Sequence, residues 1–214
     1  CITALLTIGS TFYFAQNLPV DFEARGYGAS WTWTVFENST NPSLQIVANP
    51  DPTGLNTSST VARFIALQAG NPWAGCETMH GSDIGSFSID TSNSIIRIMV
   101  WKTKISDVGI KLVTSSAASL GEIKVANTLI NQWEQLTFDF SAHIGGLAYD
   151  QLVVFPDFVA RSANDTMYFD NVFGDAAYLG DDEISRNTTT VFPNPTNGIV
   201  TVKSDSRIDL IALY

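Results

Sequence analysis

The stretch Ser94–Lys102 carries the clearest periodic pattern in the chain. Its residues alternate between an aliphatic set and a more varied set: Ile96, Ile98 and Val100 against Arg97, Met99 and Trp101. A period of two places successive side chains on opposite faces of a β-strand. We therefore predict a strand whose aliphatic side chains are buried and whose Arg97 and Trp101 are accessible to solvent.

Similar short apolar segments recur through residues 18–174, roughly every 10–15 residues, and none of useful length has helical periodicity. The chain also has 15 Gly and 8 Pro, which suits many short strands joined by turns. We predict an all-β fold, a two-sheet antiparallel β-sandwich of the jelly-roll type with about eleven strands. Its first strand is expected at Leu18–Ala24.

The charge of the chain restricts the partners it can attract. The formal net charge is −10 and the pI is about 4.4, so attraction to nucleic acid or to an anionic membrane is disfavoured. An acidic surface with embedded aromatic residues fits a protein that handles neutral ligands. Of the two cysteines, Cys76 has no basic residue beside it and is predicted to be a buried, inert thiol.

Residues 1–15 contain no charge and are almost wholly apolar or small. They are predicted to be a secretory signal peptide, truncated at its start, with Ala15 at a plausible cleavage point. The run is too short for a spanning helix of about 20 residues, so no membrane span is expected in the mature protein. A buried first strand is the alternative. Removal of this segment would leave only Cys76, and hence no intrachain disulfide.

The composition of the sequence changes near residue 175. Residues 175–189 are polar and linker-like, and residues 190–214 begin a second β pattern. The run VFPNPTNG, Val191–Gly198, with the alternating Ile199–Lys203, resembles the start of a C-terminal sorting domain of the type IX secretion system of Bacteroidetes. The resemblance implies a truncated domain, the type IX secretion machinery as a partner, and a secreted or cell-surface protein that crosses the outer membrane.

Residues 18–174 resemble jelly-roll carbohydrate-binding modules of secreted Bacteroidetes proteins. The matching stretches are Val20–Glu23, Asn49-Pro50, Gly54–Ser58, Trp73–Gly75, Trp133–Phe140 and Tyr168–Val172. The resemblance implies a non-catalytic module that binds a polysaccharide, such as a β-glucan or another neutral glycan. It also implies a structural Ca²⁺ between the first and last strands. The matching positions are Glu23 and Asp170, with Asp51 and Asn56 as further oxygen ligands.

A sugar-binding face needs an aromatic plane for the apolar C–H face of a pyranose and planar polar groups for its hydroxyls. Trp101 and Arg97 meet both needs on one strand face. Further candidates are expected on neighbouring strands or at the rim: Lys111, Gln135, Trp73, Glu77 and His80. Each could instead be packing or surface, and Trp33 and Trp133 are interpreted as core or edge packing.

Two other functions compete with glycan binding. One is an adhesion or structural module that binds a protein partner. The other is a small polysaccharide-degrading enzyme, but the Glu-x-Asp-x-x-Glu motif of sandwich-fold glucanases is absent, and neither His80 nor His143 has a metal-ligand spacing. No catalytic residue is therefore assigned.

Overall fold

The computed structural model describes residues 19–173, 190–192 and 201–203. The chain divides into two compact units, Cys1–Leu179 and Gly180–Tyr214. The predicted signal peptide and linker lie outside the described residues, as does most of the predicted sorting domain. Within the second unit, β13 (Thr190–Phe192) pairs antiparallel with β14 (Thr201–Lys203).

Within residues 19–173 the structure has twelve short strands and one 3₁₀ helix, η1 (Ser141–His143). The strands are β1 (Trp33–Phe36), β2 (Gln45–Ala48), β3 (Thr60–Ala66), β4 (Gly75–Thr78), β5 (Phe87–Ser88), β6 (Ile95–Trp101), β7 (Asp107–Val113), β8 (Glu122–Ala126), β9 (Trp133–Asp139), β10 (Ala148–Tyr149), β11 (Gln151–Phe155) and β12 (Asp165–Asp170). No helix among the described residues has the length and apolar character needed to cross a membrane.

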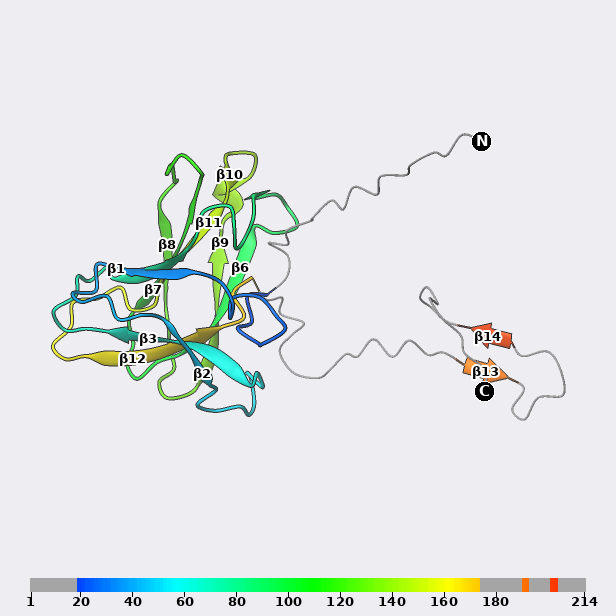
Figure 1. Ribbon diagram of the computed structural model, residues 1–214, viewed down its shortest axis with the longest axis horizontal. Coiled ribbons are helices and arrows are strands. Elements are labelled where there is room, and N and C mark those ends of the chain that lie inside the picture. Colours follow the sequence, from blue (N-terminus) through cyan, green and yellow to red (C-terminus); the bar gives the residue numbers. More distant parts are fainter. Residues whose placement is uncertain (1–18, 174–189, 193–200, 204–214) are drawn as a thin grey trace, which may run out of the picture. The chain divides into compact units, whose positions relative to one another are not determined.

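Two five-stranded antiparallel sheets form the sandwich (Figure 1). Sheet 1 has the order β1-β4-β11-β7-β8, and sheet 2 has the order β2-β3-β12-β6-β9. The short strands β5 and β10 pair separately. Strands that are distant in sequence, such as β3 and β12, lie side by side (Figure 1). The predicted all-β, two-sheet antiparallel sandwich is confirmed.

One apolar core lies between the two sheets. Sheet 2 contributes the predicted inward residues of β6, together with Leu136 and Phe138 of β9 and Phe140 just after it. Sheet 1 contributes Cys76 and the alternate residues of β7 and β11. The predicted burial of Cys76 is confirmed, and this burial raises the pKa of its thiol well above its ordinary value.

The predicted first strand, Leu18–Ala24, is wrong. Val20 forms only an isolated bridge to Val172 near the end of the domain. Phe22 then has a φ of 53°, in the left-handed region, which interrupts an extended run. The Asp21 carboxylate accepts the backbone N–H groups of Glu23 and Tyr27, so the segment turns instead of continuing along a sheet.

Strand β6 offers a matched test of the two-sheet packing. Ile98 is fully buried in the core, whereas Ile95, on the same strand, is 40% exposed. We expect Ile98→Ala to lower the free energy of unfolding by about 2–5 kcal/mol, because it removes buried methyl groups and leaves a cavity. Ile95→Ala should cost less than about 1 kcal/mol. Urea denaturation followed by circular dichroism measures both, and equal losses would contradict the assigned faces.

Candidate functional site

A row of charged side chains crosses the outer face of sheet 1. Cys76 faces the core, so its neighbour Glu77 faces outward. The strand register then aligns Glu77 with Val153, Val153 with Lys111, and Lys111 with Glu122. Residues directly opposite one another share a face of the sheet. Glu77, Lys111 and Glu122 therefore form one row with alternating charge.

An aromatic floor lies beside this row. Phe155 of β11 pairs with Gly109 of β7, and a Cβ at Gly109 would approach the Phe155 ring to 3.0 Å. A Cβ at Gly75 would lie 3.2 Å from the same ring and 2.8 Å from that of Phe36. The two glycines thus leave room for aromatic rings to lie close to the backbone. The Phe36 and Phe155 rings meet edge to face, with centroids 5.7 Å apart.

Two loops complete the walls around the floor. Phe158, just after β11, contacts Phe155 at a centroid distance of 5.4 Å. Trp73, just before β4, is 47% exposed. The resulting cleft has a volume of about 340 Å³, near the lower end of the usual range for ligand pockets. It is lined by Phe36, Trp73, Lys111, Glu122, Phe155 and Phe158.

The charges at the cleft are balanced and partly desolvated. Burial raises the pKa of Glu77, and the nearby positive charges of Lys111 and His80 oppose this shift. The Lys111 ammonium lies 5.8 Å from the Phe155 ring centroid, and the Lys124 ammonium lies 4.3 Å from that of Phe158. Both distances allow cation–π attraction. The cleft therefore combines aromatic surface with hydrogen-bonding groups of both charges.

The seven predicted ligand-binding residues do not share one surface. Trp73, Glu77 and Lys111 gather at the outer face of sheet 1, with His80 in the loop after β4. Arg97, Trp101 and Gln135 belong to β6 and β9 in sheet 2. Gln135 lies on β9, which pairs with β6, so its predicted place beside the Arg97 and Trp101 strand is confirmed. The same expectation for Lys111 is wrong, because β7 lies in the other sheet. Alternation within a strand cannot show which strands become neighbours.

Sheet 2 carries a second, smaller hydrophobic cluster on its outer face. Val61, Met99 and Trp133 are buried there, and Leu55 from the loop after β2 packs over them. Trp101 is partly exposed and contacts Tyr168 edge to face at 5.5 Å. Arg97 is also partly exposed, while Ile96, Ile98 and Val100 are buried, as predicted. The predicted packing role of Trp133 is confirmed, and Trp33 packs against the main core.

His80 lies within ion-pair distance of a carboxylate, that of Asp150. Its Nδ1 lies 2.7 Å from Asp150 Oδ1, and its side chain is 40% exposed. His143, by contrast, is buried, and its Nδ1 lies 3.1 Å from the hydroxyl oxygen of Tyr149. A protonated His80 would place a positive charge near Glu77. His80 is therefore placed to orient polar groups at one end of the charged row.

Asp170 is the predicted metal ligand whose surroundings fit a cation best. It is fully buried, and desolvation raises its pKa to about 7. Its Oδ2 accepts a hydrogen bond of 2.9 Å from the Asn56 amide, and its Oδ1 accepts the backbone N–H of Asn171 at 2.8 Å. A buried carboxylate without a paired cation is costly. Hard oxygen donors of this kind suit Ca²⁺.

The other predicted metal ligands have different contacts. Glu23 Oε1 accepts the backbone N–H groups of Ser59 and Thr60, on the same segment that carries Asn56. The carboxylate of Asp51 accepts the Thr53 hydroxyl, and its carbonyl accepts the Trp133 indole N–H. In residues 19–173, no group of three or more His, Cys, Asp or Glu side chains could hold a metal ion. Asn56 directs its amide nitrogen toward Asp170, because its Oδ1 accepts the backbone N–H of Ser58. Of the predicted ligands, Asp170 is therefore the oxygen donor whose surroundings fit a cation.

Several residues of the cleft were not predicted from the sequence. Phe36, Phe155, Phe158 and Glu122 line it, and none belonged to the predicted set. A signal existed for Phe36, because Trp33 and Val35 face the core and their neighbour must face outward. Nothing comparable marked Phe158, which lies in a loop after the strand ends.

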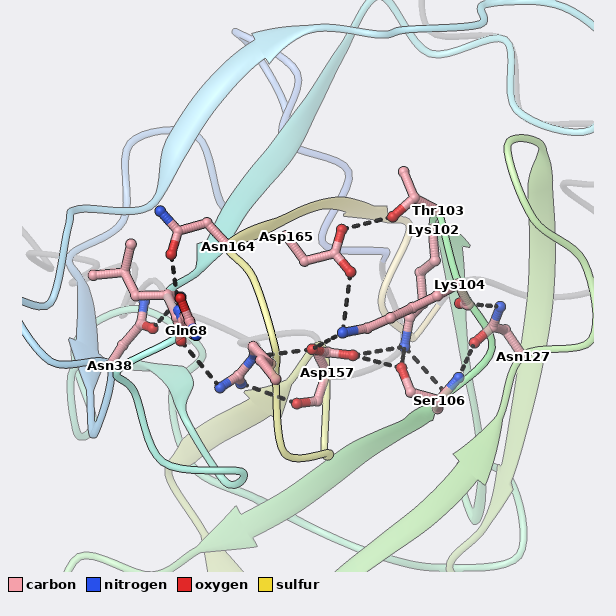
Figure 2. Close-up of polar contacts among 12 residues, drawn as sticks. Asn38, Gln68, Lys102, Thr103, Lys104, Ser106, Asn127, Asp157, Asn164 and Asp165 are labelled. Atoms are coloured by element: carbon pink, nitrogen blue, oxygen red, sulfur yellow. Dashed lines mark hydrogen bonds and ion pairs between the residues drawn. The ribbon is translucent and has the colours of Figure 1, made fainter.

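A buried ionic cluster, defined by Asp157, Lys102, Lys104 and Arg161, lies at the end of the sandwich that carries Phe158. Figure 2 shows the side chains of Lys102, Lys104 and Ser106 converging on Asp157. The Asp157 carboxylate is fully buried. Its Oδ2 lies 2.9 Å from Arg161 Nε and 3.2 Å from Lys104 Nζ, and its Oδ1 lies 3.8 Å from Lys102 Nζ. The two lysines are far along the chain from Asp157 and Arg161, so no local sequence pattern predicts this cluster.

Comparison with known proteins shows the fold. No protein-family model matches the sequence, and no curated protein matches it. Solved structures do match. The α-L-arabinofuranosidase MgGH51 with bound arabinose is 13% identical, with a TM-score of 0.50 over 74% of this chain. The match covers 25% of the arabinofuranosidase, so this chain spans about a quarter of its length.

Two carbohydrate-binding modules are also similar. The CBM22-1 xylan-binding domain of Paenibacillus barcinonensis Xyn10C is 13% identical, with a TM-score of 0.43, over 71% of this chain and 88% of that domain. A family 29 carbohydrate-binding module is 12% identical, with a TM-score of 0.45, over 77% of this chain and 96% of that module. At these identities the likeness to solved structures concerns the β-sandwich fold alone.

The buried ionic cluster makes stability depend on pH. Desolvation lowers the pKa of Lys102 from 10.5 to about 8, against the opposing effect of Asp157. Between about pH 8 and pH 10.5 the unfolded chain binds the proton that folded Lys102 has released, so this lysine makes stability rise with pH. Lys102→Met should remove that rise. Urea denaturation of both proteins at pH 7, 8, 9 and 10 measures the difference, and parallel pH profiles would contradict the assignment.

Proposed function

We propose that the outer face of sheet 1 binds a neutral polysaccharide and that the domain is a non-catalytic glycan-binding module. The observation that carries the proposal is the cleft itself, where the exposed Trp73 indole stands beside a phenyl floor and the charged groups of Lys111 and Glu122. Aromatic rings stack on the C–H faces of pyranoses, and charged side chains bind their hydroxyls. The cleft supplies both kinds of contact within one sheet face.

The charge pattern supports a neutral ligand. The outer face of sheet 1 carries Glu77 and Glu122 close to Lys111 and Lys124, two charges of each sign. A polyanionic chain would gain no net attraction from this set, and the whole chain has a formal charge of −10. A neutral glycan can use both the carboxylates as acceptors and the ammonium groups as donors.

The carboxylates of this face are spaced for binding rather than for glycoside hydrolysis. Glu77 and Glu122 lie three strand positions apart in sheet 1. Adjacent strands are about 4.8 Å apart, so the two positions are separated by roughly 14 Å. Retaining and inverting glycosidases need separations of about 5–9.5 Å. These two strand positions are thus farther apart than the carboxyl groups of a catalytic pair, which supports binding without hydrolysis at this face.

Export and targeting are predicted from segments that lie mostly outside the residues that the structure describes. Secretion across the outer membrane, type IX sorting and a place outside the cell stay predictions from residues 1–15 and 190–214. They are compatible with a polysaccharide ligand, because such ligands occur outside cells.

The proposal predicts a different effect for tryptophans on the two sheets. We expect Trp73→Ala to weaken polysaccharide binding at least about tenfold, equivalent to about 1.4 kcal/mol, because it removes the exposed stacking plane. Trp101→Ala, on sheet 2, is the matched control and should bind within about twofold of the wild type. Affinity electrophoresis in gels that contain β-glucan, mannan, xylan or chitin measures both.

The outcomes separate the candidate functions. Loss of binding in Trp101→Ala alone would move the site to the outer face of sheet 2. No retardation of the wild type by any of these polysaccharides would contradict glycan binding and favour a protein partner. Thermal unfolding of each variant shows whether a loss of binding reflects a loss of folded protein.

We also propose that Ca²⁺ binds at Asp170, with Glu23 as a further oxygen donor and with the Asn56 amide turned so that its Oδ1, in place of its nitrogen, faces the ion. The support is the buried Asp170 carboxylate, whose charge no cation among the described side chains neutralises within ion-pair distance. The ion would supply a positive charge there and join the start of the domain to its end. Backbone carbonyls and water would have to complete the six to eight ligands that Ca²⁺ prefers.

Metal removal tests this second proposal. We expect EDTA to lower the melting temperature by several degrees, because an ion bound only to the native state stabilises it by mass action. Ca²⁺ in excess over EDTA should restore the melting temperature, and Mg²⁺ should restore it less. Asp170→Asn should abolish the effect, whereas Asp139→Asn, at an exposed position, should preserve it. An unchanged melting temperature in EDTA would contradict Ca²⁺ binding.

A further inference from the structure

The exposed Trp73 stands on a tight turn. In the run Asn71-Pro72-Trp73-Ala74, the Ala74 N–H donates to the Asn71 carbonyl at 2.9 Å. Proline at the second position of such a turn fixes φ near the required value. The direction of the Trp73 side chain therefore depends on how the Asn71 carbonyl is held.

A buried guanidinium holds that carbonyl. Arg161 Nη1 donates to the Asn71 carbonyl at 2.9 Å and lies 3.5 Å from the Leu67 carbonyl. The Arg161 side chain has no exposed surface. The Asn71 carbonyl thus accepts two hydrogen bonds, one from its own turn and one from a cation that is part of the buried ionic cluster. Hydrogen bonds from a charged donor are stronger than those between neutral groups.

The same cluster holds the opposite wall of the cleft. Asp157 binds Arg161 through Oδ2 at 2.9 Å and through its backbone carbonyl at 3.1 Å. The next residue, Phe158, donates its backbone N–H to the Asp107 carbonyl at 2.8 Å and packs on Phe155. Lys102 and Lys104 hold Asp157 from the side of β6 and β7 (Figure 2). One carboxylate and one guanidinium therefore connect the two loops that carry Phe158 and Trp73.

We propose that Arg161 is a positioning residue for glycan binding: its ion pair with Asp157 fixes the distance and angle between the Trp73 and Phe158 walls of the cleft. This inference rests on the proposed function of the cleft. Arg161 touches no ligand, because its side chain is buried and does not line the cleft. Its planar fork can bond Asp157 and the Asn71 carbonyl at once, which a lysine ammonium in its place cannot reproduce.

The turn is also anchored at Glu37, both by its backbone and by the Asn71 side-chain amide, which donates to the Glu37 carboxylate. The Asn71 backbone N–H donates to the Glu37 carbonyl at 2.7 Å at the end of β1, so the turn stays attached when Arg161 is changed. The Lys104 ammonium bridges Asp157 and Asp165 at 3.2 Å and 3.1 Å, and neither ion pair involves the Asn71 turn. Lys104→Met therefore disturbs the ionic cluster without removing the bond to the turn.

The test compares Arg161→Lys with Lys104→Met by affinity electrophoresis. The probe is the β-glucan, mannan or xylan that retards the wild type most. We expect Arg161→Lys to weaken binding at least fivefold and Lys104→Met to change it less than twofold, although both lower the melting temperature. In a Trp73→Ala background, Arg161→Lys should cause no further loss, because its effect passes through Trp73. Wild-type affinity in Arg161→Lys, or an equal loss in both backgrounds, would overturn the proposal.

A measurement without glycan separates this inference from the proposed function. The fluorescence anisotropy of Trp73 is obtained as the difference between each protein and the same protein carrying Trp73→Phe. Arg161→Lys should lower the Trp73 anisotropy, and Lys104→Met should not. If the wild type binds none of the polysaccharides while this difference is found, the proposed function fails and the positioning stands. Equal anisotropy in wild type and Arg161→Lys would refute the positioning.

Native-state hydrogen exchange of the wild type tests the inference if Arg161→Lys does not fold. The Ala74 N–H, bonded to Asn71, and the Phe158 N–H, bonded to Asp107, should open together, since one ionic cluster holds both loops. We expect the exchange rates of the Ala74 and Phe158 N–H groups to depend in the same way on urea at low concentrations. Exchange of Ala74 that is independent of Phe158 would contradict the coupling.

Discussion

The burial of one apolar face from each five-stranded sheet against the other is the interaction on which the rest of the structure depends. It fixes which residues of every strand face inward, and thereby which face outward. On sheet 1 the outward positions include Glu77 and Lys111. On β6 of sheet 2 they include Arg97 and Trp101. The two sets lie on opposite faces of the sandwich, so no rearrangement of side chains could bring them into one site.

The cleft exists because small residues interrupt the outer face of sheet 1. Gly75 and Gly109 leave no side chain beside the Phe155 ring, so that ring and Phe36 lie low on the sheet. The walls rise from loops on either side, at Trp73 and Phe158. A sheet face with ordinary side chains at both glycine positions would force these rings outward and fill the hollow. The backbone of the strands thus decides the depth of the cleft, while the loops decide its width.

Much of the fold could be predicted from the sequence, and much less of the site. The alternation of Ile96, Ile98 and Val100 with Arg97 and Trp101 predicted the two faces of β6, and the structure bears it out. The expectation that Lys111 lies on a strand next to β6 is wrong, because β7 pairs with β8 and β11 instead. Local patterns report which side a residue faces. They carry no information on the partner strand.

The sequence by itself determined the class of fold, the inward face of most strands and the burial of Cys76, because these follow from the periodicity and polarity of adjacent residues. Only the tertiary structure decided that Trp73 and Phe158 face one cleft and that Asp157 joins Lys102 to Arg161. The physical reason is the distance along the chain over which each property is determined. The burial of a side chain is set within a few residues, whereas a cleft or an ionic cluster is set by sheet order and by loops that meet only after the core has formed.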